Sequence, residues 1–165
     1  MNVRFYLVAL AVWVLDHLAK AAARALLSAG ANVEVIPGLL ALSYVENTGV
    51  AFGLFADVRS PWKPYVLAAM AIAAVAVIIA YSLRLARSRT LLQAALAITL
   101  GGILGNFTDR VAHGYVVDFV DLHAGERFHW PTFNVADSAI TIGIALLLFD
   151  ALRHPEPGER GGAEE

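Results

Sequence analysis

Two uninterrupted apolar stretches constrain the fold of this chain more than any other feature of its sequence. Residues 65–83 and 90–108 are each 19 residues long and contain no Asp, Glu, Lys or Arg. A helix of about 20 apolar residues crosses the hydrocarbon core of a bilayer. The whole chain of 165 residues is 59% hydrophobic and only 16% charged, whereas soluble domains average about a quarter charged residues. We therefore expect lipid to be the solvent for most of the fold.

Two further segments have the length of membrane spans but contain charged residues. The first, at 5–27, is interrupted by Asp16, His17 and Lys20, and residues 135–149 are apolar except for Asp137. The sequence predicts four transmembrane helices, at about 5–27, 65–83, 90–112 and 136–153, in one membrane domain spanning 1–153. A cleaved signal peptide is the alternative for the first segment, but Asp16 within it and three later spans argue against cleavage.

The positive charges predict the orientation of these helices. They precede the first helix, crowd the short link between the second and third, and follow the fourth: Arg4, Arg84, Arg87, Arg89, Arg153 and Arg160. Because cytoplasmic segments carry the excess of Lys and Arg, both termini are predicted to be cytoplasmic. The long connections 28–64 and 113–135 then face outward. The tail 154–165 is rich in Pro, Gly and Glu and is predicted to be a disordered cytoplasmic segment.

The first outer connection has the pattern of short strands. Residues 33–36 and 39–45 are rich in β-favouring apolar residues and are separated by Pro37-Gly38, a turn signal. Residues 49–55 continue in an extended or looped pattern. Because strands cannot leave backbone groups unpaired in hydrocarbon, we expect a small extracytoplasmic β-sheet and loop resting on the outer membrane surface.

Charged and small residues inside the predicted helices indicate how the helices contact one another. Asp16 and Lys20 are four residues apart, so both lie on one helix face, and a structural ion pair is the favoured interpretation. Gly101 and Gly105 form the spacing that brings membrane helices into close contact. A nucleotide-binding glycine loop is a poor alternative, because that motif follows a strand.

Polar residues gather toward the outer end of the third helix. Asn106 and Arg110 share a face, and Asp109 is adjacent. Either a helix-end hydrogen-bond network or orientation of a substrate would explain them, and the sequence leaves both open. Asn47-Thr48-Gly49 reads as a turn; the functional alternative is that Asn47 presents its amide to a substrate backbone.

Two aspartates differ from the others in their setting. Asp118 follows Val116-Val117 just beyond the third helix, and Asp137 opens the fourth, so both fall at the outer membrane edge. Two carboxylates close together in a low-dielectric site share a proton; the ionised member can activate water while the protonated one polarises a carbonyl. The alternative is structural: Asp137 is favoured at a helix N-terminus by the dipole, and Asp118 is a loop acid.

Other chemistries have weaker support. His113, His123 and His129 lie near Asp118 and Asp121 in sequence, but no His-Glu-x-x-His helix is present, so a membrane-interface location is favoured over a zinc peptidase. Ser138 lacks the Gly-x-Ser-x-Gly setting of a nucleophile. The net charge of −2 indicates no nucleic-acid partner. A membrane scaffold or small transporter remains the rival from another class, and it predicts that Asn is tolerated at 118 and 137.

Five short blocks in this order, together with four spans, resemble the bacterial lipoprotein signal peptidases, the type II signal peptidases. The blocks are Asp16-His17-Leu18-Ala19-Lys20, Asn47-Thr48-Gly49-Val50-Ala51-Phe52, Gly101-Gly102-Ile103-Leu104-Gly105-Asn106-Phe107-Thr108-Asp109-Arg110, Val116-Val117-Asp118-Phe119, and Phe133-Asn134-Val135-Ala136-Asp137-Ser138. One departure is His17, where the family usually has Gln, which puts only local polar contacts in doubt.

The resemblance implies a multi-pass aspartyl endopeptidase of the bacterial cytoplasmic (inner) membrane, with its active site facing the periplasm or cell exterior. Its substrates would be prolipoproteins bearing a diacylglyceryl cysteine, cut just before that cysteine. Segment 33–60 would form the sheet and a lid. We expect membrane lipid as a partner, a monomer, and no cofactor or metal. The roles implied are catalysis by Asp118 and Asp137; substrate positioning by Asn47, Gly101, Asn106, Arg110 and Asn134; and support by Asp16, Lys20 and Asp109.

Overall fold

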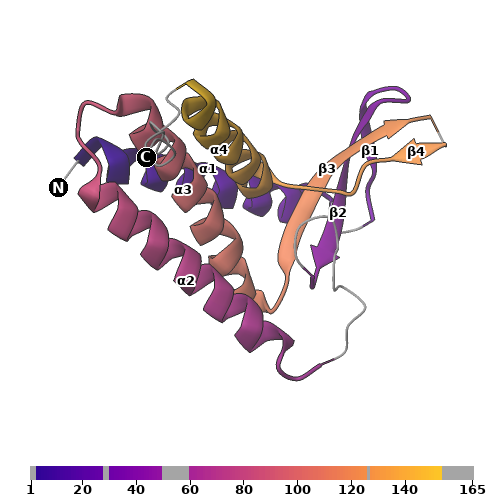
Figure 1. Cartoon of the computed structure of the whole chain (residues 1–165). Coiled ribbons are helices and arrows are strands. Elements are labelled where there is room, and N and C mark those ends of the chain that lie inside the picture. Colours follow the sequence, from indigo (N-terminus) through magenta and orange to yellow (C-terminus); the bar gives the residue numbers. More distant parts are fainter. Residues whose placement is uncertain (1–2, 28–29, 50–59, 126, 154–165) are drawn as a thin grey trace, which may run out of the picture.

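Four long helices form the membrane part of the chain (Figure 1). The computed structural model describes residues 3–27, 30–49, 60–125 and 127–153. The helices are α1 (Val3–Leu27), α2 (Lys63–Arg84), α3 (Thr90–His113) and α4 (Val135–Arg153), each long and apolar enough to cross a membrane. The four predicted spans are therefore confirmed. The predicted disordered tail at 154–165 and the part of the predicted lid at 50–59 lie outside the described residues.

A small antiparallel sheet stands at one end of the helices, as Figure 1 shows. Its strands are β1 (Val33–Ile36), β2 (Leu40–Asn47), β3 (Val116–Ala124) and β4 (Phe128–His129), in the order β1-β2-β3-β4. The sequence predicted β1 and most of β2 but no strand in the connection 113–135. That prediction was incomplete, because β3 is the longest strand and pairs with β2 from Leu40↔Leu122 to Asn47↔Val116. Asp118 thus lies on a strand, opposite Val45 of β2, and not in a loop.

Helix α3 is the centre of the membrane part, since it contacts α1, α2 and α4. Its glycines permit this close packing. A Cβ atom at Gly101 would lie 2.6 Å from the backbone oxygen of Ala9 in α1, and one at Gly102 would lie 2.5 Å from that of Ala136 in α4. The predicted helix contact through the glycine face of α3 is confirmed, and it draws α1 and α4 together around the outer half of α3.

Helix α2 has the opposite character. Ile78 and Ser82 are its only buried residues, whereas most of its large apolar side chains, including Met70, Ile72 and Val77, are exposed. A helix whose apolar side chains face outward fits a lipid surface. Helix α2 therefore packs on α3 from outside, and the polar part of the fold is built from α1, α3, α4 and the sheet.

Candidate functional site

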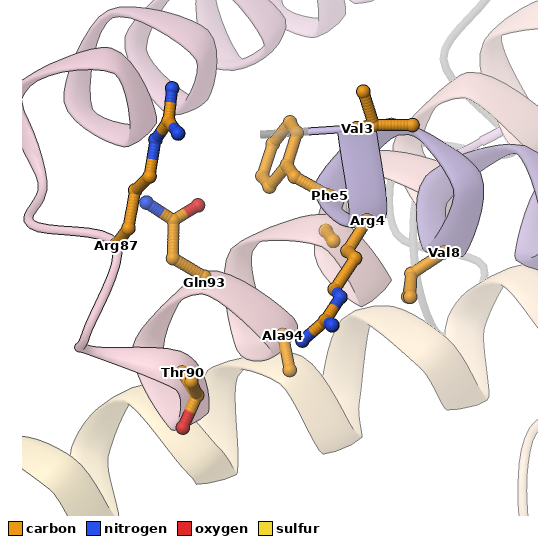
Figure 2. A pocket seen from close by; sticks show the side chains of 9 residues that line it. Val3, Arg4, Phe5, Val8, Arg87, Thr90, Gln93 and Ala94 are labelled. Atoms are coloured by element: carbon orange, nitrogen blue, oxygen red, sulfur yellow. The ribbon is translucent and has the colours of Figure 1, made fainter. Parts of the chain in front are cut away.

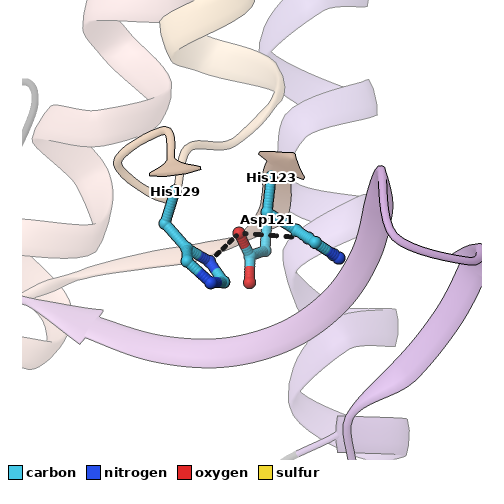
Figure 3. Close-up of side chains that lie close together, drawn as sticks. All are labelled: Asp121, His123 and His129. Atoms are coloured by element: carbon cyan, nitrogen blue, oxygen red, sulfur yellow. Dashed lines mark hydrogen bonds and ion pairs between the residues drawn. The ribbon is translucent and has the colours of Figure 1, made fainter. Parts of the chain in front are cut away.

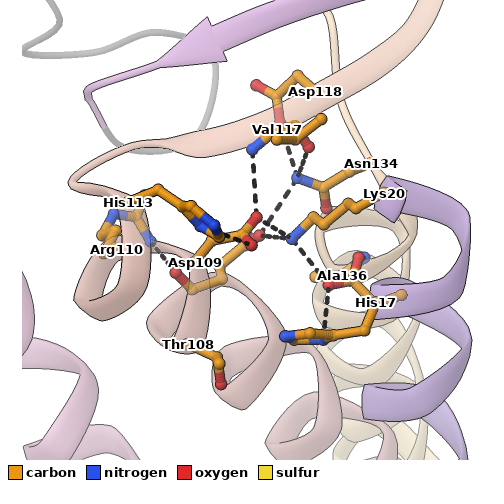
Figure 4. A network of polar contacts seen from close by, with 12 residues as sticks. His17, Lys20, Thr108, Asp109, Arg110, His113, Val117, Asp118, Asn134 and Ala136 are labelled. Atoms are coloured by element: carbon orange, nitrogen blue, oxygen red, sulfur yellow. Dashed lines mark hydrogen bonds and ion pairs between the residues drawn. The ribbon is translucent and has the colours of Figure 1, made fainter. Parts of the chain in front are cut away.

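The ammonium group of Lys20 lies at the centre of a buried polar network between the helices and the sheet (Figure 4). Its Nζ atom is 2.7 Å from Asp16 Oδ2 and 3.0 Å from Asp109 Oδ2, and it donates a hydrogen bond of 2.9 Å to Asn106 Oδ1. An ammonium has three protons to donate, and here three acceptors surround it. The predicted Asp16–Lys20 pair is confirmed, and Asp109 joins it as a second carboxylate.

Asp16 and Asp109 each hold a segment that carries one of the two candidate catalytic aspartates. Asp16 Oδ1 accepts the backbone N–H of Ala136 at 2.8 Å, in the first turn of α4. Asp109 Oδ2 accepts the backbone N–H of Val117 at 3.2 Å, at the start of β3. The first N–H groups of a helix have no partner within the helix, so Asp16 satisfies one of them from another helix. The network around Lys20 thereby positions the neighbours of Asp118 and Asp137.

Asn134 connects the two aspartates directly. Its Oδ1 accepts the backbone N–H of Asp137 at 2.9 Å, while Asp137 Oδ2 accepts the backbone N–H of Asn134 at 3.3 Å. This reciprocal pair is a capping box with an aspartate at its third helical position. The Asn134 amide nitrogen donates to Asp118 Oδ1 at 2.7 Å. Asp137 is thus a helix-capping residue, as the structural alternative held, and also a member of the aspartate site.

Two more asparagines complete the hydrogen bonding of the aspartates. Asn106 Nδ2 donates to Asp137 Oδ1 at 2.8 Å, and Asn47 Nδ2 donates to Asp118 Oδ2 at 2.9 Å. Each of the four carboxylate oxygens therefore accepts a hydrogen bond from an asparagine amide or from the Asn134 backbone. Asn47 also forms the predicted turn, because its Oδ1 accepts the backbone N–H of Gly49 at 2.8 Å. The amide of Asn47 points to an aspartate, which the sequence did not predict.

Arg110 fastens this turn to α3. Its guanidinium donates to the backbone oxygen of Gly49 at 2.8 Å and to that of Asn106 at 3.4 Å. The hydrogen bond to Gly49 spans 61 residues of sequence. Arg110 therefore keeps Asn47 in reach of Asp118, and it brings a second positive charge to the aspartates besides Lys20.

Burial shifts the protonation equilibrium of Asp118, whose residue surface is only 1% exposed. Removal from water is the largest cause that raises its pKa, and the negative charge of Asp137 raises it as well, whereas the Asn47 and Asn134 hydrogen bonds lower it. The net effect is a pKa of about 6, against the ordinary 3.8. The site gathers four carboxylates, Asp16, Asp109, Asp118 and Asp137, around two cations, Lys20 and Arg110. A proton shared by Asp118 and Asp137 would reduce that excess negative charge.

Two grooves open beside the aspartates. Asp137 lines one of about 390 Å³, whose other walls are mainly apolar or hydroxyl-bearing: Leu122, Trp130, Thr132, Phe133, Ser138, Ile140, Thr141 and Ile144. Arg110 lines the other, of about 630 Å³, with the start of α2, including Lys63, Tyr65 and Leu67. Asp118 is almost fully buried whereas Asp137 is half-buried, so Asp137 is the member of the pair that borders open space.

Some predicted residues lie away from this site. Gly101 contacts α1 through Ala9 and Val12 and does not reach the aspartates. His113 lies 3.8 Å from Asp109 and packs beside the ring of Tyr115, and His123 and His129 lie together on the sheet. A third pocket, of about 590 Å³, opens at the other end of α3; Figure 2 shows Arg4 and Arg87 on its walls, near the first turns of α1 and α3. Its basic lining fits the end that the charge pattern predicts to be cytoplasmic.

Sequence reasoning missed the contribution of Asp16 to α4 and the bridging role of Asn134. The latter had a signal, because Asn134 and Asp137 are spaced as an N-cap residue and its third helical position. The contact of Asp16 with Ala136 joins residues 120 positions apart, and no local pattern indicates it.

Comparisons with known proteins agree with this arrangement. The family model described as signal peptidase (SPase) II matches residues 8–153. The lipoprotein signal peptidase of Pseudomonas aeruginosa (strain UCBPP-PA14) is 43% identical over 148 residues, which cover 90% of this chain and 87% of that protein. That of Alteromonas mediterranea is 37% identical over 164 residues, covering 99% and 88% of the two chains.

Two solved structures, both described as bacterial membrane enzymes, share the fold with a TM-score of 0.80. One is 28% identical and covers 99% of this chain and 96% of its own; the other is 31% identical and covers 93% and 95%. The matches in sequence and in structure extend over the helices, the sheet and the aspartate site. This bacterial membrane protein therefore belongs to the signal peptidase II family, the lipoprotein signal peptidases.

Proposed function

We propose that Asp118 and Asp137 are the catalytic pair of this signal peptidase, and that they hydrolyse the bond just before the diacylglyceryl cysteine of a prolipoprotein. The observation that carries the proposal is the convergence of hydrogen-bond donors on all four carboxylate oxygens. Preorganised carboxylates need little rearrangement when a substrate arrives. The raised pKa of Asp118, about 6, supports a pair that keeps a proton to a higher pH than an exposed aspartate does.

In the proposed reaction, the ionised aspartate takes a proton from a water molecule, whose oxygen attacks the scissile carbonyl carbon. The protonated aspartate gives its proton to the carbonyl oxygen, and collapse of the tetrahedral intermediate releases the cysteine amine with a proton from the pair. No covalent acyl-enzyme and no metal ion takes part. The accessible position of Asp137 beside the apolar groove supports entry of the peptide from that side.

The asparagines and Arg110 would position the substrate by holding the pair and its surroundings. Asn47, Asn106 and Asn134 each donate to an aspartate, and Arg110 borders the second groove. Gly101 would contribute indirectly, through the contact of α3 with α1. Asp16, Lys20 and Asp109 would support the site by holding the start of α4 and the start of β3 in place. The two largely apolar grooves are suited to the signal peptide and the acyl chains, with membrane lipid around them.

The proposed topology has both termini in the cytoplasm and the sheet on the periplasmic or outer side. The Arg residues at the inner pocket support this orientation, as does the position of the sheet at the opposite end (Figure 1). The proposed acting unit is a monomer.

The proposal is tested by cleavage of a diacylglyceryl prolipoprotein by purified wild type, Asp118→Asn and Asp137→Asn, with and without a chelator. General acid–base residues contribute roughly 10²–10⁴ in rate, so each Asn variant should lose at least about 10² in kcat/KM, and the wild type should be unaffected by the chelator. Asp150→Asn is the matched control, because Asp150 belongs to the same helix and pairs with Arg89 far from the site. Full activity in either Asn variant would refute the pair, and a wild type that does not cleave the substrate would support a non-catalytic scaffold.

A further inference from the structure

A second polar cluster, which the peptidase mechanism does not use, lies on the sheet (Figure 3). Asp121 and His123 are two residues apart on β3, so their side chains point to the same face. His129 on β4 pairs with His123 in the strand register, and the two rings are stacked with centroids 5.1 Å apart. We call these three residues the hairpin cluster. Strand alternation turns them away from Asp118, which points to the other face of β3.

The distances between possible ligand atoms in the hairpin cluster are close to those between the ligands of one metal ion. Asp121 Oδ1 lies 3.3 Å from His129 Nδ1 and 3.8 Å from His123 Nδ1, and one ligand atom from each residue lies within 4.8 Å of the others. Ligand atoms about 2.1 Å from a tetrahedral zinc ion stand roughly 3.4 Å apart. A small closure of the cluster would therefore give all three atoms bonding distance to one ion.

His123 supplies an independent indication. Its side chain is only 8% exposed, yet its Nδ1 atom has no hydrogen-bond partner. A buried polar atom without a partner is costly unless a ligand or ion satisfies it. Glu34 Oε1 lies 4.0 Å from the opposite ring nitrogen, Nε2. A carboxylate beside the second nitrogen of an imidazole favours the tautomer whose Nδ1 lone pair is free to bind a metal.

We propose that Asp121, His123 and His129 bind one divalent transition-metal ion of the zinc class, which holds β4 against β3. Two imidazoles and one carboxylate suit zinc, copper(II) or nickel, and do not suit calcium or magnesium, which prefer oxygen ligands. The half-exposed His129 side chain leaves room for solvent at the remaining position. The ion would be structural: it stabilises the hairpin that precedes Phe133 and Asn134 and takes no part in hydrolysis.

The first test is calorimetric titration of the untagged, chelator-treated, full-length protein in detergent with zinc chloride. We expect one saturable equivalent per chain. His129→Gln should weaken binding at least about tenfold, and it should fold, because that side chain is 56% exposed. His113→Gln is the control, since His113 lies outside the hairpin cluster. Equal zinc affinity in His129→Gln, half an equivalent per chain, or no saturable binding would each overturn the proposal.

A second readout distinguishes coordination from a change in folding. Electron paramagnetic resonance of the protein loaded with one equivalent of copper(II) should show hyperfine coupling to two imidazole nitrogens. His129→Gln should retain coupling to one, and Asp121→Asn should retain both while binding copper more weakly. Zinc should raise the Tm of the wild type and leave that of His129→Gln unchanged. Identical copper spectra in wild type and His129→Gln would refute the assignment of His129 as a ligand.

Discussion

The network around Lys20 and the hairpin cluster combine the same kinds of groups, carboxylates with nitrogen bases, but in different surroundings. In the network, buried Asp16 and Asp109 face an ammonium that is 2% exposed and that donates to three acceptors. In the hairpin cluster, one imidazole is half-exposed and another has a buried nitrogen without a partner. The chain itself supplies every partner of the Lys20 ammonium, whereas the hairpin cluster needs an added ion to satisfy its free nitrogen.

This difference follows from depth. Water cannot reach the network between α1, α3 and α4, so an unpaired charge there would be expensive. In the hairpin cluster, on the sheet beyond the helices (Figure 1), only His129 is exposed, so solvent can satisfy that imidazole but not the buried Nδ1 atom of His123. The buried charges of the network therefore hold the architecture together, whereas the hairpin cluster keeps a nitrogen atom free to bind an ion.

The strongest test of the comparison removes the central charge. Lys20→Met should leave Asp16 and Asp109 buried without their counter-ion and destabilise the protein by about 3–5 kcal/mol. Unfolding in mixed micelles, followed by circular dichroism, measures the loss. Lys63→Met is the matched control at the half-buried start of α2 and should cost less than about 1 kcal/mol. Similar costs for the two lysines would contradict a special role for the network.

The buried aspartates should also make the stability of the protein depend on pH. Because burial raises the pKa of Asp118 to about 6, the folded protein keeps a proton that the unfolded chain loses near pH 4. Its contribution is therefore complete below the unfolded pKa and is lost as pH rises through 6. The stability of the wild type relative to Asp118→Asn should fall by up to about 3 kcal/mol across this range. A constant difference between the two proteins would contradict the raised pKa.

A smaller effect is expected where the helices approach each other. A Cβ atom at Gly102 would lie 2.5 Å from the backbone oxygen of Ala136, close to Asn134 and Asp137. Gly102→Ala should cost about 1–3 kcal/mol by overpacking and should lower kcat together with stability. Ala69→Leu adds bulk on the lipid face of α2 and is expected to be neutral in both measurements. An unaffected Gly102→Ala variant would show that α4 can shift without moving the aspartates.

The smallest effect belongs to the hairpin cluster in the absence of metal. His129→Gln removes a half-exposed ion pair and the stacking of this ring on His123, so in excess chelator it should change stability by less than about 0.5 kcal/mol. In zinc the same variant should be clearly less stable than the wild type. A large loss in chelator would mean that the cluster is held together by its own hydrogen bonds, as the Lys20 network is.

The four helices and the pairing of Asp16 with Lys20 were predictable because their signals are local, whereas the role of Asp118 and Asp137 rested on the family resemblance. Apolar length identifies the spans, and Asp16 and Lys20 pair at helical spacing. Strand β3 also has a local signal, since Val116, Val117, Phe119 and Val120 favour extended structure. The attachment of Asp16 to the start of α4, and of Arg110 to Gly49, depends on tertiary packing and leaves no pattern in the sequence.

The capping of α4 makes the beginning of that helix a natural reporter of the site. The amide proton of Asp137 is donated to Asn134, and that of Ala136 to Asp16. A ligand that displaces Asp118 also shifts Asn134, which is hydrogen-bonded to it, and thereby changes the environment of these two backbone protons. Their exchange rates and chemical shifts would register binding from within the backbone, so an inhibitor can be detected without a substrate, a label or a turnover assay.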